Sequence, residues 1–207
     1  MTRVVAINGS PRKKGNTADL IKTAFEEFEK AGYKTEMLHI GDQALIGCQA
    51  CFDCRKKPDN TCKYKKDVFN QTYAKCLDAD IILLGSPVYV GGMTSSMKAF
   101  IDRACIVSKA NGQPFSRKIG ASVVAVRRNG GLETFNSLND FFLISEMTIV
   151  GSSYWNQGVG KDKGEVMEDE EGIRTIRKLA ENIIWLRNLI ETQEQEPKTK
   201  KPKKNKS

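Results

Sequence analysis

Four of the six cysteines lie close together in the sequence. Cys48, Cys51, Cys54 and Cys62 form the pattern C-x2-C-x2-C-x7-C. Three thiolates at every third position can converge on one small inorganic cluster, and the fourth can close the cage from the far end of the loop. Four cysteine thiolates are the normal ligand set of a [4Fe–4S] cluster. The spacing therefore predicts that this segment holds such a cluster.

Two other interpretations of these cysteines stay open. Zinc also accepts four thiolates, although its sites usually show two separated C-x2-C pairs, and the thiols could also hold nothing. The pattern differs from the bacterial ferredoxin run, in which the last cysteine follows sooner and precedes a proline. The longer gap suits a single cluster in a self-contained loop. Cys76 and Cys105 stand alone in the sequence, and we expect them to be core residues.

A second candidate site lies in the segment 9–17, which reads GSPRKKGNT and joins the first predicted strand to the first predicted helix. It offers hydroxyls at Ser10 and Thr17, an amide at Asn16 and a guanidinium at Arg12. Together with the N–H groups of a helix start, these form a cradle for an anion, and the expected anion is a phosphate. The spacing matches neither the GxxxxGK loop nor the GxGxxG turn. The alternative is a capped helix behind a solvated basic loop.

Two further loops carry groups that suit a flat ligand. A proline fixes the backbone, a tyrosine offers an aromatic face, and glycines and an asparagine expose main-chain and amide groups to a polar ring edge. The first loop contains Pro87, Val88, Tyr89, Val90 and Gly91, and the second contains Asn129, Gly130 and Gly131. Ligands of doubly wound sheets bind at the carboxyl ends of the strands. We therefore expect the three loops to form one site.

The hydrophobic pattern predicts the elements that position these loops. Short apolar runs predict strands, and apolar stripes at helical spacing predict the helices between them. The expected strands are 3–8, 34–40, 80–85, 119–126 and 148–154, and the expected helices are 16–31, 66–77, 95–104, 132–146 and about 169–191. This alternation predicts a doubly wound five-stranded parallel sheet with helices on both faces.

The same pattern predicts one domain and a tail. The domain extends over residues 1–192 and carries a cysteine-rich insertion at 41–64, after the second strand. An insertion of that length is usually functional or disordered. Residues 193–207 are rich in lysine and poor in apolar side chains, so we expect them to be disordered.

The segments GSPRKKGNT and ADIILLGSPVYVGGMTSSMKAFIDR resemble the flavodoxin-like NAD(P)H-dependent FMN reductase superfamily, and the resemblance extends over residues 3–190. It implies a sheet of order 2-1-3-4-5. It also implies that Ser10, Arg12, Asn16 and Thr17 hold the phosphate of FMN, while the loops 87–91 and 129–131 border the isoalloxazine ring.

The cysteine-rich insertion resembles that of the iron-sulfur flavoproteins of anaerobic archaea and bacteria, a subgroup of this superfamily. The resemblance implies a homodimer or homotetramer with FMN and a [4Fe–4S] cluster as cofactors, in which the cluster passes electrons to FMN. We expect ferredoxin or NAD(P)H as the electron donor and a small molecule or another protein as the acceptor. No side chain need act as a general acid or base, so we name no catalytic residue.

Two other functions remain open at this point. One is an NAD(P)H-dependent FMN or quinone reductase whose cysteines hold no cluster. The other is a non-enzymatic flavodoxin-like binding module.

The net charge of +8 first indicates a nucleic-acid or membrane-surface partner. However, residues 197–207 hold six lysines and no acid, while residues 1–196 hold 27 basic and 25 acidic side chains. Because the excess belongs to the tail, we do not expect a nucleic-acid partner. No apolar run reaches the roughly 18 residues of a spanning helix, and the N-terminus lacks a signal-peptide pattern. We expect no membrane span and a cytoplasmic location.

Overall fold

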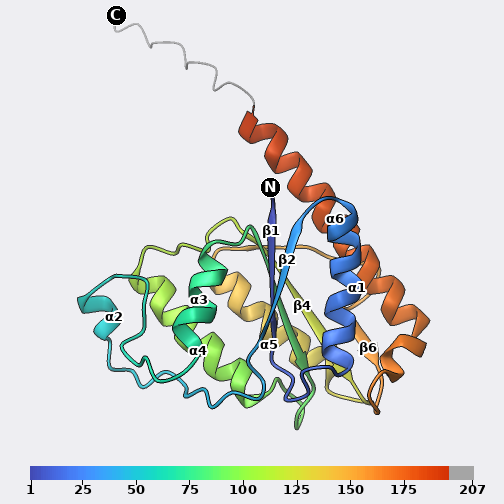
Figure 1. The fold of residues 1–207 in the computed structure, drawn as a ribbon, viewed down its shortest axis with the longest axis horizontal. Helices are drawn as coiled ribbons and strands as arrows, with labels where there is room; N and C mark the ends of the chain where they lie inside the picture. The colour runs from blue at the N-terminus through green and yellow to red at the C-terminus, as the bar shows by residue number, and fades with distance from the viewer. Residues whose placement is uncertain (196–207) are drawn as a thin grey trace, which may run out of the picture.

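The computed structural model describes residues 1–195, in which six strands form one parallel sheet with helices on both faces (Figure 1). The strand order is β2-β1-β3-β4-β5, and β6 pairs with β4. The predicted fold class and order are therefore confirmed. The strands are β1 Arg3–Asn8, β2 Lys34–His39, β3 Ile81–Pro87, β4 Ile119–Val126, β5 Thr148–Ile149 and β6 Gln157–Val159.

The helices divide between the two faces of the sheet. The helices α1 (Asn16–Lys30) and α6 (Glu170–Gln195) cover one face, while α3 (Phe69–Leu77), α4 (Ser95–Ala110) and α5 (Gly131–Ile144) cover the other (Figure 1). Each layer has its own hydrophobic core, with Leu20, Phe28 and Ile183 on the first face and Phe69, Phe100 and Phe142 on the second. Two short helices complete the structure, α2 (Asp53–Lys56) and the 3-10 helix η1 (Glu165–Glu168).

The central strands explain why continuous apolar runs predicted them correctly. β1, β3 and β4 lie between two strands each, and almost every residue of β3 and β4 is buried. A parallel strand covered by helices on both faces has no polar side to present to water. β2 lies at the edge of the sheet and is only half-buried.

The prediction of one long fifth strand is wrong. β5 pairs with the start of β4 through Thr148 and Ile149, and β6 pairs with its end. The residues 150–156 leave the sheet between them. In this segment Ser152 Oγ lies 2.6 Å from Oδ1 of Asn156. Such local side-chain bonds compete with strand pairing, so two short strands share the place of one.

Two helix ends also differ from the prediction. α4 continues to Ala110 instead of 104, and α6 continues to Gln195 instead of about 191. The expected tail from 193 on thus begins inside a helix, and its remainder, 196–207, lies outside the described residues. Within residues 1–195, none of the helices combines the length and apolar character that a membrane span requires.

Arg103 on α4 anchors the cysteine-rich insertion to the domain. The residue is only 2% exposed, and its Nη1 lies 2.5 Å from Oδ2 of Asp67. Nη1 also donates to the carbonyl of Ile46 (3.4 Å), and Nη2 donates to the carbonyl of Tyr64 (2.9 Å). Ile46 precedes the first cysteine of the cluster pattern and Tyr64 follows the last. One guanidinium therefore closes the insertion at both ends.

Replacing Arg103 with Met removes the charge and keeps most of the apolar stem. Asp67 then stays buried without its partner, so we expect the free energy of unfolding to fall by about 3 to 5 kcal/mol. Urea unfolding followed by circular dichroism measures the change. Lys98→Met, which removes an exposed ion pair with Asp102 on the same helix, is the control and should leave stability nearly unchanged. Equal stability of the two variants would contradict the anchoring role.

Candidate functional site

The loop between β1 and α1 has the features expected of an anion site. Gly15 occupies the N-cap position of α1 and offers no side chain to the first N–H groups of the helix. Ser10 is buried, and its Oγ accepts a hydrogen bond from the Arg12 N–H (3.2 Å). Thr17 Oγ1 is buried and has no hydrogen-bond partner within the described residues. An unsatisfied buried hydroxyl beside a helix start favours a bound anion.

Asn16 has a different position from the other expected phosphate ligands. Its Nδ2 donates to the carbonyl of Gly160 (3.0 Å), and its Oδ1 accepts from the Gly164 N–H (2.8 Å). The side chain thus ties the start of α1 to the segment that follows β6. We therefore assign the Asn16 side chain a positioning role, while its backbone N–H stays at the helix start.

The loop after β3 makes a tight turn. Tyr89 and Gly92 exchange backbone hydrogen bonds of 2.8 and 3.0 Å. Val90 and Gly91 form the turn with φ angles of +49° and +75°. The left-handed conformation is costly for a β-branched residue, and Val90 is also fully exposed. Backbone strain of this kind often occurs in functional loops, and the ligand contact expected of this segment stays a prediction.

The three loops meet at the carboxyl edge of the sheet. Thr94 Oγ1 donates to the carbonyl of Gly9 (2.8 Å), and the Thr94 N–H donates to Oγ of Ser86 (3.0 Å), so the first and second loops are joined. A Cβ built on Gly130 would lie 2.8 Å from Cγ1 of Val88, so the third loop packs on the second. The tertiary structure therefore brings together the three segments that the sequence singled out.

Two residues at this edge were not expected from the sequence. Thr94 is the N-cap of α4, and a threonine directly before an apolar helix is a recognisable capping signal. Gln157 lies against the third loop, where a Cβ on Gly131 would be 2.1 Å from its Oε1. Gln157 belongs to β6, a strand that the sequence did not predict, so no local signal could place it.

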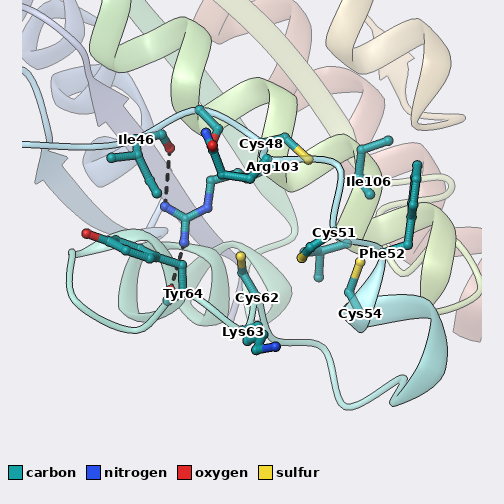
Figure 2. A pocket seen from close by; sticks show the side chains of 13 residues that line it. Ile46, Cys48, Cys51, Phe52, Cys54, Cys62, Lys63, Tyr64, Arg103 and Ile106 are labelled. Carbon is teal, nitrogen blue, oxygen red and sulfur yellow. Dashed lines mark hydrogen bonds between the residues drawn. The ribbon is translucent and has the colours of Figure 1, made fainter.

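All four cysteines of the C-x2-C-x2-C-x7-C pattern line one cavity of about 310 Å³. Figure 2 shows the four side chains around it, with Tyr64 and Arg103 on one side and Phe52 and Ile106 on the other. The apolar part of the wall includes Ile46, Phe52, Ile106 and Val107. The cavity is thus a thiol-rich chamber with mostly hydrophobic walls.

The four thiols differ in exposure but influence one another. Cys54 is buried, Cys48 and Cys62 are half-buried, and Cys51 is exposed. Burial raises the pKa of the Cys54 thiol, and negative charge on Cys62 or Cys48 raises it further. Thiolates repel one another, and a bound metal removes this penalty because it stabilises the deprotonated form.

Local backbone conformation and a helix side chain shape this chamber. Ala50 and Phe52, on either side of Cys51, have φ angles of +50° and +55°. The backbone is therefore in the left-handed conformation on both sides of that cysteine. At the far end, the Cys62 N–H donates to Oδ1 of Asn70 (2.7 Å), and Nδ2 of Asn70 donates back to the Cys62 carbonyl (2.9 Å). Asn70 lies on α3, and the sequence analysis did not single it out.

Arg103 faces the same chamber. The residue lines the cavity, and its Nε is buried without a hydrogen-bond partner in the part of the chain that the structure describes. The buried Asp67 carboxylate balances the charge of the guanidinium. In residues 1–195, no three His, Cys, Asp or Glu side chains are grouped closely enough to hold a single metal ion.

The two candidate sites are in contact at the end of β2. A Cβ on Gly41 would lie 2.0 Å from the carbonyl oxygen of Ser10, and Nε2 of His39 lies 2.7 Å from the same oxygen. The start of the cysteine-rich insertion therefore packs against the loop between β1 and α1. His39 links this strand end to its neighbours, because its Nδ1 also lies 3.2 Å from Oδ1 of Asp42.

The two isolated cysteines lie apart from this pattern. Cys76 on α3 is buried in the core, and burial raises the pKa of its thiol to about 12. Cys105 on α4 is half-buried and packs against the same core. Both positions agree with the expectation of core cysteines.

Comparison with known proteins supports the same view of the molecule. Residues 2–162 match the family described as NADPH-dependent FMN reductase. A solved structure of RosB with a bound flavin phosphate intermediate superimposes with a TM-score of 0.74 at 15% identity, and covers 100% of this chain and 95% of that one. The Trp repressor binding protein of Bacillus subtilis superimposes with a TM-score of 0.63 at 20% identity, over 85% and 96% of the two chains. These structures share the flavodoxin-like fold.

Sequence relatives are more specific. An iron-sulfur flavoprotein of Methanocaldococcus jannaschii is 35% identical over 91% of this chain and 98% of the relative. An iron-sulfur flavoprotein of Methanosarcina thermophila is 31% identical over 91% and 97%. The chain therefore belongs to the NADPH-dependent FMN reductase family, and within it to the group of the iron-sulfur flavoproteins.

Proposed function

We propose that this oxidoreductase binds FMN at the three loops and a [4Fe–4S] cluster at Cys48, Cys51, Cys54 and Cys62, and that electrons pass between the two groups. The observation that carries the proposal is the single cavity that all four cysteines line. The family membership makes the chain a flavin-dependent redox protein. The names of the relatives support the presence of an iron-sulfur centre in addition to the flavin.

The first loop fits the phosphate end of FMN. Thr17 Oγ1 lacks a partner among the described residues, and Gly15 leaves the first turn of α1 open to an anion. Arg12 is exposed beside them and supplies a positive charge. In this proposal Ser10, Arg12, Thr17 and the Asn16 N–H hold the phosphate.

The second and third loops fit the ring system. Tyr89 is half exposed beside the strained turn, and Gly130 packs against Val88 without a side chain in between. In this proposal the ring is bordered by Pro87, Val88, Tyr89, Val90, Gly91, Asn129, Gly130 and Gly131.

The spacing of the thiols fits a cluster better than a zinc ion. Zinc sites usually show two separated C-x2-C pairs, whereas three of the four cysteines here stand in one run. A [4Fe–4S] cluster spreads its ligands because each thiolate binds a different iron. The cavity of about 310 Å³ also suits a cluster.

Each part of the chain then has a defined task. When bound, FMN supplies two-electron chemistry and the cluster supplies one-electron chemistry. Arg103 and Asn70 hold the two ends of the cysteine-rich insertion in place, and hydrophobic side chains form much of the wall of the chamber. The loops at the strand ends fix the flavin against the sheet. No side chain is required to act as a general acid or base.

The proposal also includes the redox partners, the oligomeric state and the cellular location. They are a ferredoxin or NAD(P)H as electron donor, a small molecule or another protein as acceptor, a homodimer or homotetramer, and a cytoplasmic location. The alternative is an NAD(P)H-dependent reductase that uses FMN alone, which the description of the matched family favours. The two functions differ in the iron content that they predict.

Anaerobic purification separates these functions. We expect about four iron and four sulfide per chain, with broad cluster absorption beneath the flavin bands, because the four thiolates complete one cluster. Metal analysis and the visible spectrum measure this. A yellow, iron-free protein with full NADPH oxidation would contradict the cluster and favour the alternative.

Cys51→Ala removes one thiolate from the exposed side of the chamber. We expect the iron content to fall to near zero while FMN stays bound, since the flavin loops do not involve this residue. The matched control is Cys105→Ala, a half-buried cysteine outside the pattern, which should keep its iron. Loss of FMN together with iron in Cys51→Ala would show that the chamber also shapes the flavin site.

Thr17→Val keeps the shape of the side chain but removes the unpaired hydroxyl. We expect FMN affinity to fall about tenfold or more, as for a lost hydrogen bond to a charged group, and Arg12→Ala to weaken FMN binding similarly. Titration of FMN into the apoprotein, followed by flavin fluorescence, measures the affinity. Thr23→Val, whose hydroxyl bonds the Asp19 carbonyl within α1, is the control. Wild-type affinity in both site variants, with iron content unchanged, would refute the phosphate site.

A further inference from the structure

The positive charge of the described protein is concentrated on the cysteine-rich insertion. Residues 53–66 hold six basic side chains and two acidic ones, whereas the rest of residues 1–195 holds 21 basic and 22 acidic side chains. Apart from this segment, the described chain is nearly neutral. The six side chains are Arg55, Lys56, Lys57, Lys63, Lys65 and Lys66, and we call them the cationic face.

The cationic face points to solvent at one end of the molecule. All six residues are exposed, and the side chains of Lys56, Lys57 and Lys63 are 72 to 84% exposed. α2 carries the first of them and lies beyond α3 and α4, away from α1 and α6 (Figure 1). Ion pairs at such exposure contribute little to stability. The fold therefore does not explain this concentration of charge.

The charges are only partly balanced within the segment. Asp53 lies 2.8 Å from Nζ of Lys63 and 3.5 Å from Nζ of Lys56, and Asp59 lies 3.6 Å from Nζ of Lys57. Among the described residues, Lys65 and Lys66 have no acidic partner within 4.0 Å. The face thus keeps an excess of positive charge at its surface.

The cationic face borders the thiol chamber. A second hollow of about 310 Å³ is lined by Lys56, Lys57, Lys63 and Lys65 together with Asp53 and Asp59, and it shares Cys54 and Lys63 with the chamber. Figure 2 shows Lys63 beside Cys62, next to the cysteines. A molecule that binds this hollow therefore comes into contact with the wall of the chamber itself.

An apolar group lies beside the cationic face. Phe52 is 42% exposed between Cys51 and Cys54, and the Arg55 guanidinium covers its ring at 4.5 Å. Cys51 is itself exposed. An apolar centre with a charged rim is the usual anatomy of a protein–protein interface, and it is not required for binding a free anion.

We propose that the cationic face docks an acidic protein that carries one electron at a time, and that the electron enters the chain at the four cysteines. This inference rests on the proposed cluster. A nicotinamide must reach the flavin because it delivers a hydride, whereas a one-electron carrier needs only to approach the cluster. In each encounter the carrier is oxidised by one electron and the chain is reduced by one. Two encounters and two protons from solvent balance the two-electron reduction of FMN.

Electrostatic steering provides the test of this surface. Opposite charge raises the association rate by 10- to 1,000-fold at low salt, and the effect falls as ionic strength rises. The variant Lys56→Gln, Lys57→Gln, Lys65→Gln removes three charges that lie outside the thiol chamber. The control variant Lys22→Gln, Lys30→Gln, Lys178→Gln removes three exposed charges on α1 and α6, on the opposite face of the sheet.

The probes are a chemically reduced, acidic [4Fe–4S] ferredoxin and reduced methyl viologen, a small cation. With the holoprotein at low salt, we expect the second-order rate of reduction by ferredoxin to fall about tenfold in the face variant and less than twofold in the control. The rate of the face variant should also depend less on ionic strength than that of the wild type. The equilibrium affinity for oxidised ferredoxin should fall in parallel, which is a readout independent of turnover. Methyl viologen should reduce both variants at least as fast as it reduces the wild type.

Several results would overturn the docking surface while leaving the proposed function intact. One is a ferredoxin rate and salt dependence of the face variant equal to those of the wild type. Another is a change of oligomeric state in the face variant alone, measured by light scattering, which would make the face an interface between copies of this chain. A third is tighter binding of duplex DNA than of ferredoxin to the wild type. If methyl viologen fails to reduce the wild type, the proposed function itself fails.

Discussion

The ion pair between Arg103 and Asp67 is the contact on which the position of the cysteine-rich insertion depends. The two side chains are almost completely buried and lie 2.5 Å apart. A charge removed from water is costly unless its partners are fixed, so this pair admits only one arrangement of the segments that meet there. Those segments are the two ends of the cysteine-rich insertion and the start of α3, where Oδ1 of Asp67 accepts the Phe69 N–H (3.2 Å). The long insertion is thereby held against α4 as a defined chamber.

The parallel sheet supplies the second constraint. Its strands all end at the same edge, so the loops after β1, β3 and β4 meet there, although the first and the last are separated by more than a hundred residues of sequence. Thr94 and the side-chain-free Gly130 join these loops into one surface. Because Gly41 packs on Ser10 at the end of β2, the insertion starts from this same surface. Both proposed redox sites therefore adjoin the same edge of the sheet. The flavin site consists of the three loops, and the cluster site is the thiol chamber.

The distribution of charge and polarity agrees with a division of labour between these parts. The helices α1 and α6 bury an apolar layer and carry balanced pairs such as Lys30 with Glu27 on their outer surfaces. The insertion has the opposite character, with an apolar chamber inside and unbalanced lysines outside. The two cores thus hold the sheet and its helices together, and the four thiols lie in a segment outside the sheet.

The sequence alone determined the fold class, the strand order implied by the family resemblance, the three strand-end loops and the four cysteines. These are local signals, because apolar runs, loop composition and cysteine spacing are each read within a short segment. Only the tertiary structure decided that Arg103 and Asn70 hold the insertion, that the Asn16 side chain positions a neighbouring loop, and that Thr17 keeps an unpaired hydroxyl. It also decided that β5 and β6 share one place beside β4. Such features depend on contacts between residues far apart in the chain, and on which polar groups remain unpaired after burial, and neither is visible until the chain is folded.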